Sequence, residues 1–235
     1  MHLKTLLLVF SIALTSCNTI SDGKQVLERA IEYHDPGQRW DQFKGTLEIE
    51  MTTPDQSVRY SEVFIDLPGN TFTLKTERDS TQTFRTWKDG QCTFSLNGVT
   101  DLTPEEMKKH RGTCERTTMM KNYYTYLYGL PMKLMDPGSR IGEEVERKTF
   151  MGKEYLVVRV DYDPEVGQDV WCFYFDPETY AMEAYQFFKD ETTGQGEYIL
   201  LEETMDVQGM KIPKSRAWYT NKGKYLGTDL LIGAE

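Results

Sequence analysis

The fold is decided by residues 171–179, Trp-Cys-Phe-Tyr-Phe-Asp-Pro-Glu-Thr, an aromatic run that ends in an Asp-Pro turn. Aromatic residues favour strands and Asp-Pro interrupts them, so this stretch predicts one strand and the turn that follows it. The same pattern recurs throughout the C-terminal part of the chain. Strand signals there cover about 145–150, 154–162, 169–176, 181–189, 196–206, 210–220 and 224–231.

Period-two alternation also marks strands in the N-terminal part. Apolar and polar residues alternate over 47–51, 71–75 and 92–96, as expected when one face of a strand is buried. Turn signals at 67–70 and 88–90 separate these segments by the short spacing of an antiparallel meander. Together the two parts predict one domain of about ten antiparallel strands.

Two segments carry helix signals instead. Ser21 and Asp22 can cap a first helix that ends near His34, and apolar residues recur along one of its faces. Residues 103–128 begin with a proline in the first turn and two glutamates near the positive end, and Gly129 stops them. We therefore expect helices that cover one face of the sheet.

Composition narrows the class of protein. The chain has 235 residues, of which 39% are hydrophobic and 12% aromatic, enough for one domain with a substantial core. The 27 Lys and Arg residues against 37 Asp and Glu residues give a formal charge of −10. Nucleic-acid binding depends on clustered basic residues that neutralise phosphates, so this balance, without a basic run, argues against a nucleic-acid partner.

The N-terminus looks like an export signal with a lipid anchor. Lys4 precedes the apolar run 6–14, which is too short to span a membrane. Leu14-Thr15-Ser16-Cys17 resembles a bacterial lipobox, in which the cysteine is acylated and becomes the new N-terminus. The alternative is an ordinary cleavage site followed by a chance cysteine.

The lipobox predicts a signal peptide at 1–16, a lipidated tether at 17–24 and a folded domain at 25–235. Two or more acyl chains on Cys17 would hold the protein stably at a membrane, whereas one chain binds only marginally. Asn18 stands where an aspartate would favour retention in the inner membrane, so we expect the outer membrane. The acyl chains must then attach the protein to the membrane, because its acidic surface is repelled by anionic lipid headgroups.

The remaining cysteines suggest one disulfide. Export implies an oxidising compartment, where disulfides persist. Cys92 and Cys114 flank a turn and the start of a helix, and a bridge between them would tie a strand to that helix and contribute about 3 kcal/mol. Cys172 lies within the aromatic strand and is expected to be a buried free thiol. No cysteine spacing matches a zinc site, so we expect no metal and no cofactor.

Catalytic motifs are absent from the sequence. His34 beside Asp35 could belong to a metal site or an acid–base pair, but an imidazole at a helix end more often bonds a free carbonyl there. Residues 161–165 place three acids at alternate positions, as calcium loops do, yet lack the glycine of the sharp turn, which favours a plain polar turn. We expect no catalytic residue.

Aromatic side chains are the candidates for ligand binding. Tyrosine combines an apolar body with a polar tip, which suits the lip of a cavity. Aromatic residues at helical spacing also suit a packed core, and both interpretations stay open. The candidate residues are Tyr123, Tyr124, Tyr126, Tyr128, Trp171 and Phe173.

Several segments resemble known families. Residues 176–182 and 207–213 are similar to an Asp-Pro-x-Thr turn and a Gly-x-Lys-x-Pro hairpin of outer-membrane lipoprotein carriers with the LolA-like fold. Residues 30–36, 123–133 and 185–190 more closely resemble an uncharacterised bacterial lipoprotein family with a domain of unknown function. This resemblance spans nearly the whole mature chain.

The resemblance implies an α+β fold, a curved antiparallel β half-barrel of about ten strands with helices over its concave face. Carriers of that class bind acyl chains in the cavity. We therefore expect a non-enzymatic, lipid-anchored envelope protein that binds a hydrophobic or amphipathic ligand such as an acyl chain. The alternatives are an interaction lipoprotein with a packed barrel and no ligand and, with less support, a hydrolase of an envelope polymer.

Overall fold

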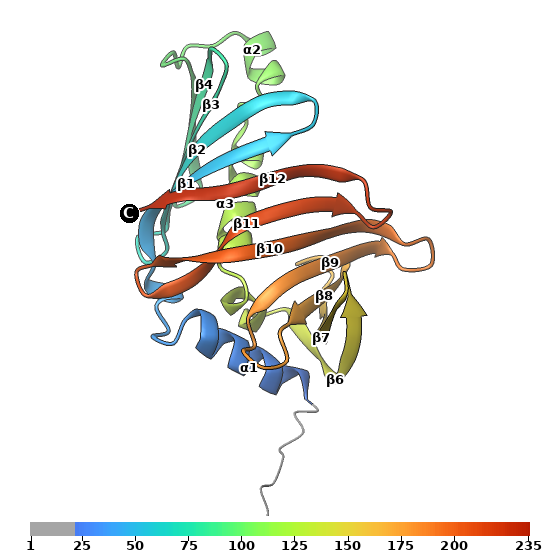
Figure 1. Cartoon of the computed structure of the whole chain (residues 1–235). Coiled ribbons are helices and arrows are strands. Elements are labelled where there is room, and N and C mark those ends of the chain that lie inside the picture. Colours follow the sequence, from blue (N-terminus) through green and yellow to red (C-terminus); the bar gives the residue numbers. More distant parts are fainter. Residues whose placement is uncertain (1–21) are drawn as a thin grey trace, which may run out of the picture.

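The computed structural model describes residues 22–235 and arranges their strands in one antiparallel sheet (Figure 1). The sheet has twelve strands in the order β5-β4-β3-β2-β1-β12-β11-β10-β9-β8-β7-β6. The strands are β1 (Lys44–Thr53), β2 (Gln56–Asp66), β3 (Thr71–Arg78), β4 (Thr81–Lys88), β5 (Gln91–Leu96), β6 (Ser139–Phe150), β7 (Lys153–Tyr162), β8 (Val170–Phe175), β9 (Met182–Asp190), β10 (Gln195–Val207), β11 (Met210–Thr220) and β12 (Tyr225–Ala234).

Helices occupy the N-terminus and the connection between β5 and β6. They are α1 (Gly23–His34), α2 (Pro104–Lys109) and α3 (Cys114–Tyr128), with single 3₁₀ turns η1 (Trp40–Gln42) and η2 (Met132–Met135). Asp22 caps α1, because its side chain accepts the backbone N–H of Lys24 at 2.9 Å.

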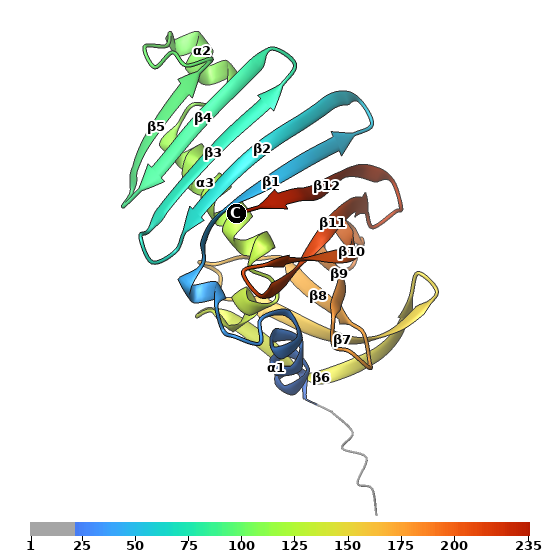
Figure 2. The same cartoon turned by 60° about the vertical axis from the view of Figure 1, so that its left-hand side comes forward.

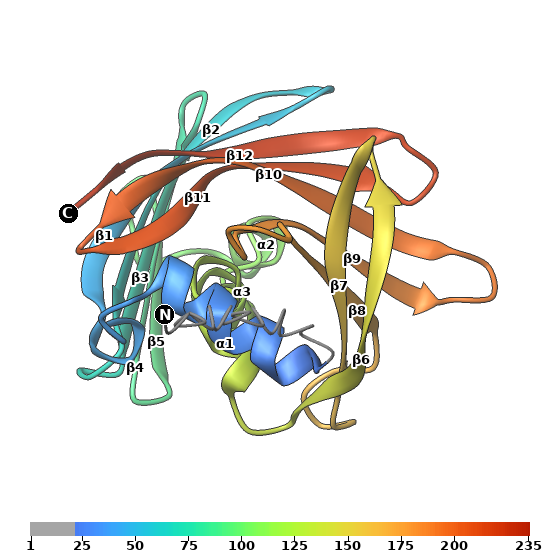
Figure 3. The ribbon, with the colours of Figure 1, turned by 60° about the horizontal axis from the view of Figure 1, so that its bottom comes forward.

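Two meanders make up the sheet, and they join where the ends of the domain meet. β1–β5 form one meander, whose strands lie side by side in Figure 2, and β6–β12 form the other. β1 pairs with β12, so the backbone N–H of Glu235 donates to the carbonyl of Thr46 at 3.0 Å. The sheet curls around α1 and α3, which lie in its hollow (Figure 3). The fold expected from the resemblance is confirmed: an α+β half-barrel with helices on the concave face.

The core lies between the helices and the concave face. Inward positions on the strands alternate with outward ones, so Phe173 and Phe175 on β8 are fully buried against the helices. α1 contributes Val26, Leu27 and Ala30, each 0% exposed, and packs against β6, β7 and β11. The apolar face predicted for this helix is therefore the one that it buries.

The strand count of about ten was low by two, because the predicted segments miss β2 and β4. The inward positions of β2 include Arg59 and Ser61 as well as Val63, and the buried position of β4 is Arg85. Polar residues on the buried face hide the alternation by which the other strands were recognised.

The single helix predicted over 103–128 is also corrected, because it is two helices. Arg111 adopts a left-handed backbone with φ of 51°, and Gly112 follows it. A Cβ at Gly112 would lie 2.5 Å from the ring of Phe94, so the chain passes too close to β5 for another residue type without rearrangement. Thr113 then caps α3 by accepting the backbone N–H of Arg116 at 3.2 Å.

The N-terminal predictions lie outside the described residues. These are the signal peptide at 1–16, the lipidated Cys17 and most of the tether at 17–24. Among the helices formed by residues 22–235, none is long and apolar enough to cross a membrane.

Candidate functional site

The concave side carries an open cavity of about 660 Å³ between α3 and the segment that leads from β7 into β8. This volume lies within the roughly 300–1,000 Å³ typical of small-molecule sites. The aromatic and apolar part of the cavity wall comes mainly from three elements. Met119, Tyr123 and Tyr126 project from α3, Tyr162 ends β7, and Trp171 stands at the start of β8.

The aromatic wall is held together by its own contacts. The ring of Tyr126 meets Trp171 edge-on at 5.9 Å between centroids, and its hydroxyl bonds that of Tyr162 at 2.5 Å. Trp171 also packs on Phe187 at 4.9 Å. Burial raises the pKa of Tyr162 to about 12 and that of Tyr126 well above its usual value, so both phenols stay neutral. The wall is therefore an uncharged surface with two hydroxyls tied to each other.

Charged side chains surround this wall. Lys121 lies over the ring of Trp87 at 4.2 Å, and Lys133 forms an ion pair with Asp136. Glu165 and Asp169 line the side formed by the β7–β8 connection. An apolar wall with a charged rim suits a ligand that has an apolar part and a polar part.

The structure divides the predicted aromatic residues into two groups. Tyr123, Tyr126 and Trp171 line the cavity. Tyr124, Tyr128 and Phe173 are at most 1% exposed and belong to the packed core.

Several lining residues were not predicted from the sequence. Tyr162 has the same inward parity as Val158 and Val160 within a predicted strand, so the alternation could have identified it. Met119 is 44% exposed on α3 and Val166 is 59% exposed on the β7–β8 connection. Nothing in their local sequence indicates that they face the same cavity.

A buried polar cluster supports α3 from the sheet side. The Arg216 guanidinium lies over the ring of Tyr128 at 4.0 Å and donates to the carbonyl of Pro213 at 2.8 Å. Asp229 faces Arg216 across β11 and β12 and is 2% exposed, and burial raises its pKa. Charged residues at this depth were not predicted from the sequence.

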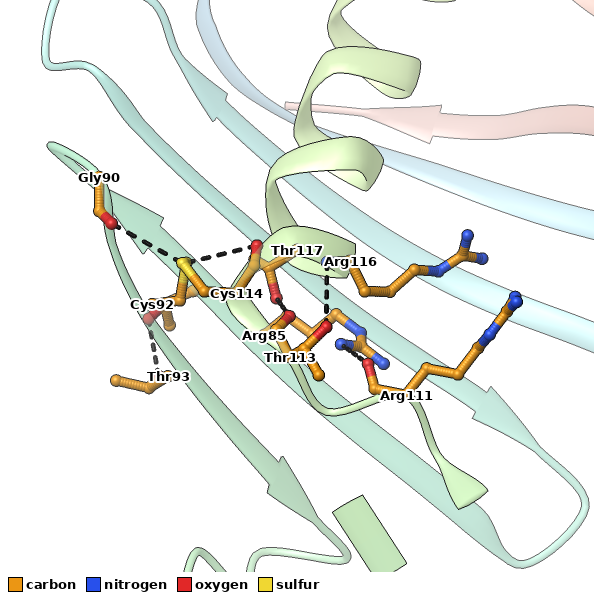
Figure 4. The surroundings of a disulfide bond; sticks show 10 residues. Arg85, Gly90, Cys92, Thr93, Arg111, Thr113, Cys114, Arg116 and Thr117 are labelled. Atoms are coloured by element: carbon orange, nitrogen blue, oxygen red, sulfur yellow. Dashed lines mark hydrogen bonds between the residues drawn. A yellow bond between two sulfur atoms is a disulfide. The ribbon is translucent and has the colours of Figure 1, made fainter. Parts of the chain in front are cut away.

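The disulfide expected from the sequence joins Cys92 on β5 to Cys114, the first residue of α3, with Cα atoms 5.3 Å apart (Figure 4). It fixes the start of α3 against the edge of the sheet. Such a bond is typical of proteins outside the cytoplasm. Cys172 is a free, half-buried thiol on β8, and burial raises its pKa.

His34 serves the fold rather than a catalytic site. It is 1% exposed at the end of α1, where Nδ1 donates to the carbonyl of Lys211 at 2.6 Å. Nε2 accepts the backbone N–H of Met182 at 3.0 Å, and these partners define a neutral ring. Among residues 22–235, no three His, Cys, Asp or Glu side chains are grouped so that they could hold a metal ion.

Solved structures with a similar fold share little sequence with this chain. A LolA superfamily protein from Nitrosomonas europaea matches with a TM-score of 0.54 at 10% identity, over 91% of this chain and 93% of that one. A domain described as a putative outer membrane lipoprotein-sorting protein from Vibrio parahaemolyticus gives 0.52 at 10% identity, with the same coverage. A DUF1329 family protein from Desulfovibrio piger gives 0.50 at 5% identity, over 92% and 93% of the two chains. At such identities the matches establish the fold alone.

No curated protein sequence matches the chain. One family model does, and it spans residues 3–234. The expected relationship to an uncharacterised family with a LolA-like fold is thereby confirmed. The chain belongs to DUF6503, a family of unknown function.

Proposed function

We propose that this protein is a lipid-anchored component of the cell envelope that binds a hydrophobic or amphipathic ligand on the concave face of its half-barrel. The observation that carries the proposal is the cavity of about 660 Å³ with its aromatic wall of Tyr123, Tyr126, Tyr162 and Trp171. An exposed concave surface of this kind is a common feature of binding sites.

The cavity is better suited to binding than to catalysis. Its aromatic hydroxyls are neutral, and those of Tyr126 and Tyr162 are bonded to each other. The charged groups lie at the rim, where Lys133 is paired with Asp136. The uncharged aromatic wall, with its two phenols tied to each other, favours a role as a binder or carrier.

Ligand binding is tested with purified, delipidated residues 18–235. Native mass spectrometry should detect an added mass when palmitic acid is supplied, and titration should quench tryptophan fluorescence because Trp171 lines the cavity. Replacing Trp171 by Ala should weaken binding about tenfold or more, since an aromatic side chain contributes roughly 1.5–3 kcal/mol on burial, and native mass spectrometry measures it because the variant lacks the reporter tryptophan. Met151→Ala is the matched control, because Met151 is 60% exposed in the β6–β7 turn and does not line the cavity.

A protein that binds neither palmitic acid nor any co-purifying amphiphile would contradict this proposal. That result would favour an interaction lipoprotein that binds another envelope component through its surface. Its packed core, which includes Tyr124, Tyr128 and Phe173, would then only stabilise the fold. Equal affinities for wild type and Trp171→Ala would place the ligand elsewhere.

The anchor requires a separate experiment. Acylation of Cys17 would place the domain at the outer membrane, tethered by the residues that precede α1. Radiolabelled palmitate should be incorporated into the full chain and not into Cys17→Ser, whereas Cys92→Ser should keep the label. Labelling that persists in Cys17→Ser would exclude the lipobox interpretation.

A further inference from the structure

Four arginines gather where α3 begins, at one end of the concave face. Arg59 comes from β2, Arg85 from β4, Arg111 from the connection between α2 and α3, and Arg116 from the first turn of α3. Figure 4 shows Arg111 and Arg116 extending in the same direction from the start of α3. This concentration of positive charge is unusual in a chain whose formal charge is −10.

None of these arginines forms a direct ion pair within the described part of the chain, although the buried carboxyl of Asp229 on β12 interacts electrostatically with Arg59. Among residues 22–235, ten ion pairs bring a basic nitrogen within 4.0 Å of a carboxylate oxygen, and none of them involves any of the four guanidinium groups. The positive charge of the cluster is therefore not neutralised by direct contact with a described acidic side chain.

Three of the four side chains make hydrogen bonds, each with a different kind of partner. Arg85 is 6% exposed and donates to the carbonyls of His110 and Arg111 at 2.7 and 2.9 Å, so it holds the α2–α3 connection in place. Arg59 donates to the hydroxyl of Tyr124 at 3.2 Å, and its Nε is buried without a partner among the described residues. The Arg116 guanidinium contacts the sulfur of Met119, at 3.2 Å. Donors on Arg59 and Arg116 therefore remain available.

Mutual repulsion is evident at Arg116. Burial lowers its pKa, and the positive charges of Arg111 and Arg59 lower it further. Like charges held together without a direct ion pair are costly, and an anion placed beside Arg111 and Arg116 would reduce that cost. Planar guanidinium groups match the geometry of phosphate and carboxylate oxygens, which makes arginine the preferred residue for such anions.

The arginine cluster is continuous with the cavity. Arg116 touches Met119, which lines the cavity, and Tyr123 and Tyr126 follow along the same side of α3. At a rise of about 1.5 Å per residue, Tyr126 lies about 15 Å along the helix axis from Arg116, ten residues earlier. One elongated molecule could therefore contact guanidinium groups at one end and the aromatic wall at the other.

We propose that Arg59, Arg111 and Arg116 bind the phosphate or similar anionic headgroup of an amphiphile whose apolar chain lies in the aromatic cavity. This inference rests on the proposed function and specifies its ligand as anionic. The binding energy of the headgroup comes from charge-assisted hydrogen bonds, and that of the chain comes from apolar burial.

The test compares monomeric dodecyl phosphate with dodecyl maltoside, which has a similar chain and a neutral headgroup. Both should quench tryptophan fluorescence of residues 18–235, and dodecyl phosphate should bind at least about tenfold more tightly, an advantage that falls with added salt. Arg111→Gln/Arg116→Gln should remove this advantage and leave dodecyl maltoside unaffected. Arg29→Gln/Arg147→Gln is the control, since it changes the net charge equally at exposed positions of α1 and β6.

Each outcome has a distinct meaning. Binding of both amphiphiles with equal affinity, or an unchanged preference in Arg111→Gln/Arg116→Gln, would overturn the headgroup site and leave the cavity intact. Failure of both to bind would contradict the proposed function itself. Inorganic phosphate is the third probe. If it binds as tightly as dodecyl phosphate, the apolar chain adds nothing to binding. The arginines would then bind free phosphate, and the proposal that the same ligand fills the aromatic cavity would be wrong.

Discussion

Lowering the pH below about 6.5 should destabilise this protein through one imidazole, that of His34. The ring closes α1 onto two strands, because Nδ1 donates to the carbonyl of Lys211 on β11 and Nε2 accepts the N–H of Met182 on β9. A second proton on Nε2 would place one N–H against another. Burial is the main cause that lowers the pKa of His34 to about 4, and the positive charges of Lys211 and Arg216 add to it.

The sign and size of the effect follow from proton linkage. The unfolded chain binds a proton at His34 with a pKa near 6.5, whereas the folded protein resists protonation until about pH 4. The unfolded state therefore binds more protons between these values, and the free energy of unfolding falls as the pH falls through this window. The loss is about 2 kcal/mol at pH 5 and approaches about 3 kcal/mol below pH 4.

Urea denaturation at several pH values measures how protonation of His34 changes the free energy of unfolding. Wild type is compared with His34→Gln, whose side chain can donate and accept hydrogen bonds but does not titrate. Carboxylates elsewhere contribute equally to both proteins, so they cancel in the difference. We expect the stability advantage of wild type over His34→Gln to shrink by about 2 kcal/mol between about pH 7.5 and pH 5.

Two results would refute this reasoning. A stability difference that stays constant across the window would show that His34 does not titrate between the folded and unfolded states as its burial requires. An advantage of wild type that grows on acidification would indicate a charged ring in the folded protein, which contradicts the acceptor role of Nε2.

Two further predictions concern local constraints on the fold. Replacing Cys92 and Cys114 by Ser should lower the free energy of unfolding, measured in urea, by about 3 kcal/mol. In wild type, neither cysteine should react with an alkylating agent until reductant is added. Alkylation of both cysteines without reduction would contradict the disulfide. Gly23→Ala should destabilise the domain by about 1–3 kcal/mol despite the helix propensity of alanine, because its Cβ would lie 2.1 Å from the carbonyl oxygen of Gly142 on β6. Lys24→Ala, at an exposed position, is the control, and equal stability of the two variants would disprove the close approach.

Much of the fold could be predicted because the strands repeat one simple pattern. From β6 to β12, turns interrupt aromatic and β-branched runs at short intervals, and all seven strands were predicted in that region. The curvature could not be derived from the alternation itself, since a period of two fixes the buried face but not how strongly the sheet bends around its helices. The curvature was predicted from the resemblance to carriers with the LolA-like fold.

The sequence did not show which residues of α3 line the cavity. Tyr123 and Tyr124 are neighbours on α3, yet the first lines the cavity and the second is 1% exposed beneath the helix. Helical geometry separates adjacent residues by about 100°, so Tyr124 packs on Phe72 of β3 whereas Tyr123 packs on Trp218 of β11 beside the cavity. Which of the two lines the cavity depends on the rotation of α3, which the disulfide at Cys114 and the contact of Tyr128 with Arg216 help to fix.

The strands missed from the sequence are also the ones that supply charge to the concave face. Arg59 and Arg85 occupy inward positions of β2 and β4 that would be apolar in an ordinary half-buried strand. Arg85 lies directly opposite Leu74 and Phe94 on the neighbouring strands, so its position is a core position by register. Proteins tend to depart from local rules at functional sites, where stability is given up for chemistry. Arg85 uses its buried position to hold the α2–α3 connection. Arg59 has a buried Nε without a partner among the described residues and lies beside Arg111 and Arg116, so its departure from the local rule is the one that supports the proposed anion site.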